Sequence, residues 1–394
     1  MSDGSRRSIL TINAGSSSLK FALFEMRSIR RELSGQISGI GQPGATLVAT
    51  GSGGVGTPTE LDAPDHARAA EGLVEWLSAN SSLSRVGAVG HRIVHGGARL
   101  TQHQRVTPAL ISELKGNQSL DPAHLPQEIS LIEMLGRKLP SIPQVACFDT
   151  AFHEGMPRVA RLLPIPRAYI ESGIRRLGFH GLSYTYLLDE LRRVGGKAAA
   201  DGRVIFAHLG SGASLSAVHR GKPVDTSMAF TPTAGLVMGT RPGDIDPGLL
   251  VHLMRLEGRT PEEMDRGINS DFGLRGVSGT SGDMKELLRR RSSDPRAAEA
   301  VELFCYQARK WIGAFAAALG GVDALVFSGG IGERSPDIRR EICQGLGFLN
   351  LVFDESLNEA NAAIISSQES AVTVRVIATD EEIVIARLVS ARLD

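Results

Sequence analysis

Apolar runs that end in glycine and small polar residues mark several buried strands along the chain. The run "ILTI" covers residues 9–12 and "FALF" covers residues 21–24, with Asn13, Gly15 and three serines between them. Helical spacing of apolar residues follows in "DHARAAEGLVEWLSA", and "VGAVGHRIVHGG" has the composition of another strand. Strands that alternate with helical segments favour an α/β fold.

The strand followed by a glycine turn occurs three times. After "NAGSSS" at residues 13–18, the chain places "LGSGAS" at residues 209–214 and "SGGIGE" at residues 328–333. Glycine lets the backbone approach a ligand, and the N–H groups, the hydroxyls and Lys20 supply donors and charge for a phosphate. One such turn would be an ordinary surface hairpin. Three of them predict an internally duplicated α/β protein that binds a polyphosphate between its halves.

Two strand patterns end in side chains suited to binding. "GHRIVHGG" places Arg92 between His91 and His95, and "VACFDTAFHE" places Asp149 directly after an apolar stretch. Such side chains at the C-terminal end of a strand face the crevice where α/β proteins bind ligands. The alternatives are a surface ion pair for Arg92 and a helix N-cap for Asp149. The two histidines have the spacing of a helical metal site, but the β-branched residues between them favour a strand.

Three later segments carry further candidates. "GFHG" holds His180 in a cramped loop, where it either faces a ligand or is satisfied locally. Residues 225–248 form a long stretch rich in Gly, Pro and Thr, with Arg241 as the one strong cation, and such loops are often functional. Asp283 and Glu381 stand where helical patterns begin, so an N-cap or a favourable helix dipole is the alternative to ligand binding.

Length, charge and cysteine content narrow the class of protein. A chain of 394 residues is long enough for two domains. Lys plus Arg and Asp plus Glu number 43 each, so no basic surplus indicates binding to nucleic acid or to an acidic membrane. Three widely spaced cysteines without a CxxC pattern, and no signal-like N-terminal stretch, favour the cytoplasm. The most apolar segment, residues 311–327, is too short and too interrupted to span a membrane.

The motifs taken together resemble those of the acetate kinases, a family of the acetate and sugar kinase, chaperone and actin superfamily. "NAGSSSLKF", "GHRIVHGG", "FDTAFH", "GFHG", "DTSMAFTP", "GLVMGTRPGDIDP" and "SGGIGE" occur in the family's order. The resemblance implies two duplicated ribonuclease H-like (actin-like ATPase) domains with the active site in the cleft between them. Residues 1–150 with 381–394 would form the acyl-substrate side, and residues 151–380 the nucleotide-binding and dimerisation side.

The resemblance also implies a reaction and a role for each matching residue. Members use Mg-ATP to phosphorylate acetate, reversibly, giving acetyl phosphate and ADP, and they act as homodimers. Mg²⁺, or Mn²⁺ in its place, would be held by Asn13 and Glu381; the catalytic set would be Asp149, His180 and Arg241; and Arg92, Val94 and Pro232 would bind the acid. The nucleotide would contact Lys20, His208, Leu209, Gly210, Ser211, Gly212, Asp283, Met284, Lys285, Gly330, Ile331, Gly332, Glu333 and Arg334.

Several positions depart from the family pattern and keep alternatives open. Ser211 replaces an asparagine, Leu182 and Tyr184 replace threonine and histidine, and Ala123 replaces a leucine of the acyl pocket. A smaller side chain at residue 123 would admit a longer acid, so a propionate kinase is an alternative to an acetate kinase. A non-catalytic ATP-binding switch of the same fold is a further alternative. A sugar kinase would need a polar pocket, which Val94, Pro232 and Ala123 do not offer.

Overall fold

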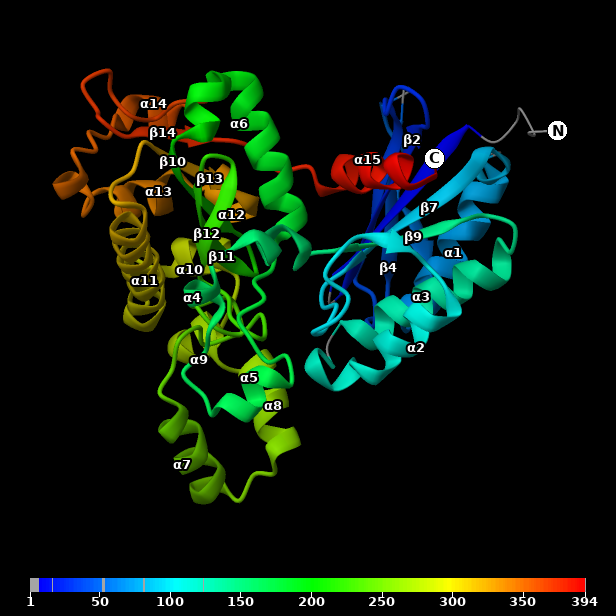
Figure 1. Cartoon of the computed structure of the whole chain (residues 1–394), viewed down its shortest axis with the longest axis horizontal. Helices are drawn as coiled ribbons and strands as arrows, with labels where there is room; N and C mark the ends of the chain where they lie inside the picture. Colours follow the sequence, from blue (N-terminus) through cyan, green and yellow to red (C-terminus); the bar gives the residue numbers. More distant parts are fainter. Residues whose placement is uncertain (1–6, 16, 52–53, 81, 123, 394) are drawn as a thin grey trace. The chain divides into compact units, whose positions relative to one another are not determined.

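The chain forms two compact units, each with its own sheet (Figure 1). The computed structural model describes residues 7–15, 17–51, 54–80, 82–122 and 124–393. Unit 1 comprises Met1–Ala151 and Asp380–Asp394, and unit 2 comprises Phe152–Thr379. The chain therefore leaves unit 1, forms the whole of unit 2 and returns to unit 1 for helix α15 (Glu381–Leu393).

Unit 1 is built on a mixed sheet. Its described strands pair in the order β5-β4-β3-β2-β1-β7-β9-β8, with β6 beside β4. The strands are β1 (Ser8–Ala14), β2 (Ser18–Glu25), β3 (Arg31–Ser38), β4 (Ala45–Gly51), β5 (Gly54–Val55), β6 (Thr59–Leu61), β7 (Val86–Ile93), β8 (Gln104–Arg105) and β9 (Gln144–Phe148). The helices are α1 (His66–Ala79), α2 (Pro108–Gly116), α3 (Leu125–Lys138) and α15 (Glu381–Leu393).

Helices cover both faces of the central strands of unit 1. On one face, alternate residues of β1 and β2 pack against apolar stripes of α1 and α3; this core includes Leu10, Ile12, Phe21, Leu23, Leu73, Leu77, Leu131 and Leu135. On the other face, α15 packs against β1 and β7 (Figure 1). Gly90 of β7 makes this packing close, because a Cβ there would lie 2.4 Å from Cγ2 of Ile385. Helix α15 can therefore pack this closely only because residue 90 is a glycine, which has no side chain.

Unit 2 contains a five-stranded sheet with the order β12-β11-β10-β13-β14 among its described residues. The strands are β10 (Arg203–Leu209), β11 (Ala213–His219), β12 (Lys222–Thr226), β13 (Ala324–Ser328) and β14 (Thr373–Val376). The helices are α4 (Arg158–Arg161), α5 (Arg167–Glu171), α6 (Gly181–Asp201), α7 (Pro247–Glu257), α8 (Pro261–Ser270), α9 (Gly273–Ser278), α10 (Met284–Arg290), α11 (Pro295–Leu319), α12 (Gly329–Arg334), α13 (Pro336–Cys343) and α14 (Glu355–Glu359).

The two sheets repeat one topology. The order β3-β2-β1-β7-β9 in unit 1 matches β12-β11-β10-β13-β14 in unit 2. In each, the first three strands of the chain order form an antiparallel meander, and the next two run parallel to the first. The predicted duplication is confirmed, and the arrangement is that of the expected ribonuclease H-like domain.

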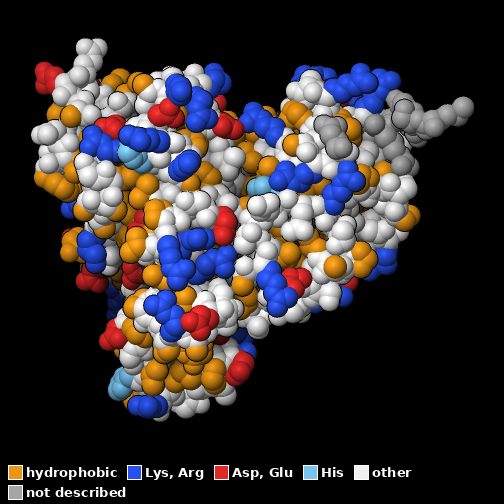
Figure 2. All heavy atoms as spheres, viewed as in Figure 1, with side chains coloured by type: hydrophobic (Ala, Val, Ile, Leu, Met, Phe, Trp, Pro, Cys, Tyr) orange, Lys and Arg blue, Asp and Glu red, His pale blue; other side chains and the backbone are white. Residues whose placement is uncertain are grey.

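The visible surface carries charges of both signs, and the most apolar segment of the chain divides between a helix and a strand. Figure 2 shows basic and acidic side chains interspersed with apolar ones over the visible face. The apolar segment at residues 311–327 divides between the end of α11 and β13, with Gly320 in a left-handed conformation between them. Within the described ranges, no helix combines the length and the apolar character that crossing a bilayer requires.

Candidate active site

Three parallel strands of unit 1 end beside one another and carry the first group of predicted site residues. Asn13 is the next-to-last residue of β1, Arg92 is the next-to-last residue of β7, and Asp149 directly follows β9. Because β1, β7 and β9 are neighbours running in the same direction, their carboxyl ends meet at one edge. We call Asn13, Arg92, Asp149 and Glu381 the carboxylate–arginine cluster.

Arg92 forms the centre of this cluster. Its Nε and Nη2 donate to Oδ2 of Asp149 at 3.0 and 2.6 Å, and its Nη1 donates to Oδ1 of Asn13 at 3.3 Å. The Asp149 side chain is fully buried and that of Arg92 is 14% exposed, so this is a buried pair and not an ordinary surface ion pair. Burial alone would lower the pKa of Arg92, but Asp149 and Glu381 outweigh it and raise that pKa above its usual value.

The start of α15 brings two more carboxylates to the cluster. Nδ2 of Asn13 donates to Oε2 of Glu381 at 2.8 Å and to Oε1 of Glu382 at 3.2 Å. Burial raises the pKa of Glu382, and the neighbouring Glu381 adds to this rise, whereas Lys20 opposes it. Lys20 is the cross-strand partner of Asn13 and shares its face of the sheet. Amide and carboxylate oxygens are donors that suit Mg²⁺, which is commonly held by one or two carboxylates together with substrate phosphates.

Glu128 is a residue of this region that the sequence analysis missed. It lies on α3, is 2% exposed, and its two carboxylate oxygens accept from the N–H of Val94 at 3.2 and 3.1 Å. Burial raises its pKa to about 8, although the charge of Arg92 opposes the rise. A signal was present, because Glu128 occupies a position of the apolar helical stripe formed by Leu125, Ile129 and Ile132.

Unit 2 brings its two glycine turns together. In the turn between β10 and β11, the N–H of Gly210 donates to the carbonyl of Gly212 at 3.0 Å. The turn after β13 lies against it, since Gly329 has φ +76° and a Cβ there would lie 2.6 Å from the carbonyl oxygen of Leu209. The N–H of Gly239 also donates to the carbonyl of Ser211 at 3.2 Å. Close backbone approach explains why residues 239 and 329 are glycines.

Two stacked imidazoles stand beside the turn between β10 and β11. The rings of His180 and His208 are 4.3 Å apart with an interplanar angle of 27°. His180 has a left-handed backbone, φ +58°, at the N-cap of α6, a conformation that is rare outside glycine and common at functional sites. A Cβ on Gly212 would lie 3.4 Å from Nε2 of His180 and 4.0 Å from Nη1 of Arg241. We call His180, His208, Arg241 and Gly210–Gly212 the glycine–imidazole cluster.

The remaining predicted residues of unit 2 lie close to this cluster. Pro232 accepts from Nη1 of Arg241 at 3.4 Å through its carbonyl. Asp283 begins α10 as an N-cap, accepting from the N–H of Glu286 at 2.9 Å, with Met284 buried and Lys285 exposed after it. Its neighbour Gly282 approaches Gly239, with 2.4 Å between a Cβ there and the Gly239 carbonyl oxygen. The N-cap alternative for Asp283 is therefore realised in the fold.

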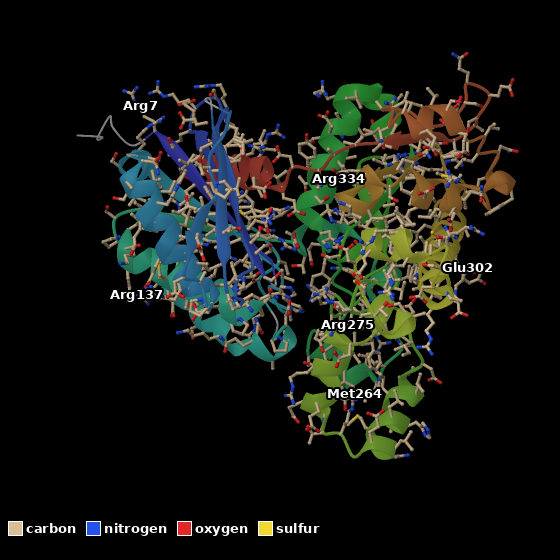
Figure 3. All side chains as sticks on the ribbon, turned by 180° about the vertical axis from the view of Figure 1, so that it is seen from behind. Arg7, Arg137, Met264, Arg275, Glu302 and Arg334 are labelled. Atoms are coloured by element: carbon tan, nitrogen blue, oxygen red, sulfur yellow. The ribbon has the colours of Figure 1, made fainter. Side chains whose placement is uncertain are left out.

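Helix α12 carries the last group, Gly330, Ile331, Gly332, Glu333 and Arg334. Glu333 accepts from the N–H of Gly329 at 2.9 Å and from the N–H of Thr379 at 3.1 Å, so its carboxylate ties the start of the helix to the end of unit 2. Arg334, labelled in Figure 3, is exposed at the end of the helix.

The histidines considered as metal ligands have other partners. Nε2 of His91 lies 2.6 Å from Oε1 of Gln144, and Nδ1 of His95 accepts from the N–H of Gly97 at 2.9 Å. No group of three or more His, Cys, Asp or Glu side chains that could hold a metal occurs in the part of the chain that the structure describes. Ala123, on which the argument for a wider acyl pocket rests, lies outside the described residues.

Comparisons with known proteins agree with these features. A model of the acetokinase family matches residues 8–387. The chain is 43% identical over 386 residues to the acetate kinase of Rhodopseudomonas palustris and 42% identical over 384 residues to the propionate kinase of Citrobacter rodentium; the matches cover 96% of this chain and 96% and 95% of those proteins. The crystal structure of Porphyromonas gingivalis acetate kinase matches with a TM-score of 0.87 and 37% identity, covering 98% of this chain and all of that one. The chain belongs to the acetokinase family.

Proposed function

We propose that this protein transfers the γ-phosphoryl group of ATP to acetate, forming acetyl phosphate and ADP, and that it catalyses the reverse reaction as well. The observation that carries the proposal is Arg92, held by the buried Asp149 at the ends of the parallel strands, with Val94 two residues away. A fixed guanidinium beside an apolar residue suits a small carboxylate, because it can make two parallel hydrogen bonds to the acid.

The reacting acid needs no general base. A simple carboxylic acid has a pKa near that of Glu, so acetate is already ionised at neutral pH and one of its oxygens can attack directly. A bond forms between that oxygen and the γ-phosphorus, and the bond from the γ-phosphorus to the bridging oxygen breaks, so ADP leaves with the bridging oxygen. Arg92 orients the attacking carboxylate, and the apolar side chain of Val94 suits its methyl group.

The glycine–imidazole cluster is proposed to act on the phosphoryl group in flight. That group spreads negative charge over three equatorial oxygens, and catalysis consists mainly of positioning and of neutralising this charge. His180 and Arg241 supply donors, and the N–H groups of Ser211 and Gly212 in the turn and those at the start of α12 bind phosphates. Asn13 and Glu381 would hold Mg²⁺, which when bound neutralises charge on the β- and γ-phosphates. Asp149 holds Arg92 in place.

The proposal extends to assembly and location. All three cysteines, Cys147, Cys305 and Cys343, are buried and free, which supports a reducing compartment such as the cytoplasm. We also propose a homodimer. None of the residues of α7, all of which are described, is buried, and Leu249, Val251 and Leu256 are 40%, 46% and 69% exposed on it. An apolar helix without cover within one chain supports assembly, which light scattering after gel filtration would test.

A second candidate is propionate as the preferred acid, favoured by a relative named propionate kinase at 42% identity. The test of both is ADP release by the purified protein with Mg-ATP, with acetate, propionate and butyrate titrated in parallel and hydroxylamine present to trap acyl phosphate. We expect acetate to give the highest kcat/KM. A higher value for propionate would select the second candidate, and ATP binding without acid-dependent ADP release would indicate a non-catalytic switch.

Two variants connect the assay to the site. Arg241→Ala should lower kcat by about 100-fold or more, the usual effect of losing one donor to transition-state charge. Arg193→Ala is the matched control. The Arg193 side chain lies on α6, is 70% exposed, and has Glu190 as its ion-pair partner among the described residues. Unchanged turnover in Arg241→Ala would contradict the proposed role of the glycine–imidazole cluster.

A further inference from the structure

Each of the two stacked imidazoles is bound at Nδ1 by a serine hydroxyl, and each serine is bound in turn by a second hydroxyl. Nδ1 of His180 lies 2.9 Å from Oγ of Ser214, which is hydrogen-bonded to the phenolic oxygen of Tyr184. Nδ1 of His208 lies 2.8 Å from Oγ of Ser183, which lies 2.8 Å from Oγ1 of Thr379. The two chains of hydroxyls have the same order.

These contacts follow from one helix turn and one pair of strands. Ser183 and Tyr184 lie in the first turn of α6, three and four residues after His180, and the N–H of Tyr184 donates to the His180 carbonyl at 3.0 Å. Ser214 is the cross-strand partner of His208 in the pair formed by β10 and β11. Ser183, Tyr184 and Ser214 are all 0% exposed, so water does not compete for these hydroxyls.

The direction of the hydrogen bonds decides which nitrogen of His180 carries the proton. A serine hydroxyl has one hydrogen, and the phenol of Tyr184 is the more acidic and better donor of the two hydroxyls. When Tyr184 donates to Ser214, the hydrogen of Ser214 is left to donate to Nδ1 of His180. An imidazole that accepts at Nδ1 carries its proton on Nε2. Thr379 and Ser183 are both aliphatic hydroxyls of equal donor strength, so a difference in acidity fixes the tautomer of His180 but not that of His208.

The Nε2 atoms face the glycine turn, where this proton would be useful. Nε2 of His180 lies 3.4 Å from the position of a Cβ on Gly212, next to Nη1 of Arg241. Nε2 of His208 lies 4.0 Å from the position of a Cβ on Gly210. Two imidazolium ions stacked at 4.3 Å beside an arginine would repel each other, whereas two neutral rings can both donate from Nε2.

We propose that Tyr184 is a positioning residue that acts through Ser214 to hold His180 as the neutral tautomer with its proton on Nε2. The proposal deepens the proposed function and rests on it, because a fixed Nε2 donor is what a phosphoryl group at the glycine turn requires. The effect of Tyr184 on the imidazole of His180 is transmitted by the buried hydroxyl of Ser214, which is bonded to both.

The first test is the ¹⁵N spectrum of the histidine-labelled protein without substrates, with His180→Asn used to assign the signals of residue 180. We expect a pyrrole-type Nε2 and a pyridine-type Nδ1 for His180. In Tyr184→Phe, the Ser214 hydroxyl loses its donor and can itself accept, so we expect the Nδ1-protonated tautomer to appear. Because this measurement needs no turnover, its result stands whether or not the protein phosphorylates acetate.

The second test is kinetic. Tyr184→Phe should lower kcat about tenfold with little change in the KM for either substrate, the order expected for one lost hydrogen bond in a buried chain. Tyr186→Phe is the matched control, since Tyr186 lies two residues further along α6 and packs against the same core, and kcat there should stay within about twofold. If His180 keeps one tautomer in both variants and kcat is equal in both, the proposal is wrong.

A double-mutant cycle separates transmission through Ser214 from general loosening of α6. If Tyr184 acts through Ser214, then Tyr184→Phe should cost nothing further in a Ser214→Ala background. Additive losses in kcat would overturn the proposal. Ser214→Ala also tests the link if Tyr184→Phe does not fold, because it removes no aromatic ring. It should remove the same preference of His180 for the Nε2-protonated tautomer.

Discussion

Glu128 should make unit 1 progressively less stable as the pH rises through neutrality. The Glu128 residue is 2% exposed, and both of its carboxylate oxygens accept from the N–H of Val94. Burial raises the pKa from 4.5 to about 8, and the negative charges of Asp121 and Asp149 act in the same direction. The positive charge of Arg92 lowers this pKa, but by less than burial raises it.

The sign and size of the effect follow from proton linkage. Between pH 4.5 and about 8, the folded state holds a proton on Glu128 that the unfolded chain has released. The free energy of unfolding therefore falls by about 1.4 kcal/mol for each pH unit in this window, or by about 2 kcal/mol from about pH 6 to about pH 7.5. The stabilisation is complete below pH 4.5 and is lost by about pH 8. Glu128→Gln stays neutral, keeps an acceptor for Val94 and lacks this loss.

The assay needs a probe confined to unit 1. The chain has two tryptophans, Trp76 on α1 in unit 1 and Trp311 on α11 in unit 2, so a Trp311→Phe background leaves fluorescence that reports unit 1 alone. Denaturant unfolding at the two pH values should show the stability advantage of Glu128→Gln growing by about 2 kcal/mol. Glu133→Gln is the control, because Glu133 is on the same helix but is 34% exposed and paired with Lys115.

Parallel pH profiles for the parent and Glu128→Gln would refute the reasoning. That result would mean that Glu128 is ionised in the folded state at pH 6, with Arg92 compensating its burial in full. A pH-dependent gap of the same size in Glu133→Gln would show that the effect belongs to the helix and not to the buried carboxylate.

Two further predictions concern the packing around the site. Gly90→Ala should displace α15, because its Cβ would lie 2.4 and 2.6 Å from side-chain carbons of Ile385 and Val389. We expect the free energy of unfolding of unit 1 to fall by about 1–3 kcal/mol, and kcat to fall with it. Gly116→Ala is the control and should change neither quantity, because a Cβ there meets no atom within 4 Å. Asp283→Ala should destabilise α10 by about 1 kcal/mol, and Asp283→Ser should restore the cap. If the carboxylate also contacts the nucleotide, both variants should raise the KM for ATP. An unchanged KM for ATP in both variants would mean that Asp283 serves only as the helix cap.

The strands and turns were predictable because their signals are local. The apolar runs before Asn13, Gly210 and Gly329 specify buried strands, and small residues specify the reversals, so the duplication follows from the sequence alone. The helix starts at Asp283 and Glu381 were predictable for the same reason. Arg92 and Asp149 could be placed at strand ends, and their neighbourhood follows from the parallel pairing of β7 and β9.

The contacts that tune these residues were not predictable. Glu128 meets the N–H of Val94 only because α3 packs over the end of β7, and no local pattern encodes that approach. Tyr184 stood out in the sequence only as a departure from the family pattern, and its partner Ser214 lies 30 residues away on another element. Tertiary packing sets which donor meets which acceptor, whereas local sequence sets where each donor is presented.

The return of α15 to unit 1 has a consequence for synthesis. Unit 2 lies between Ala151 and Asp380 in the chain, so the helix that covers β1 and β7 is translated after the whole of unit 2. At about 5–20 residues per second, this interval lasts roughly 12 to 50 seconds. During it, the sheet face that later receives Ile385 and Val389 is uncovered, and Glu381 is not yet available to Asn13. The nascent chain therefore exposes this strand face until α15 is made, and Asn13 and Glu381 come together only after unit 2 has been synthesised.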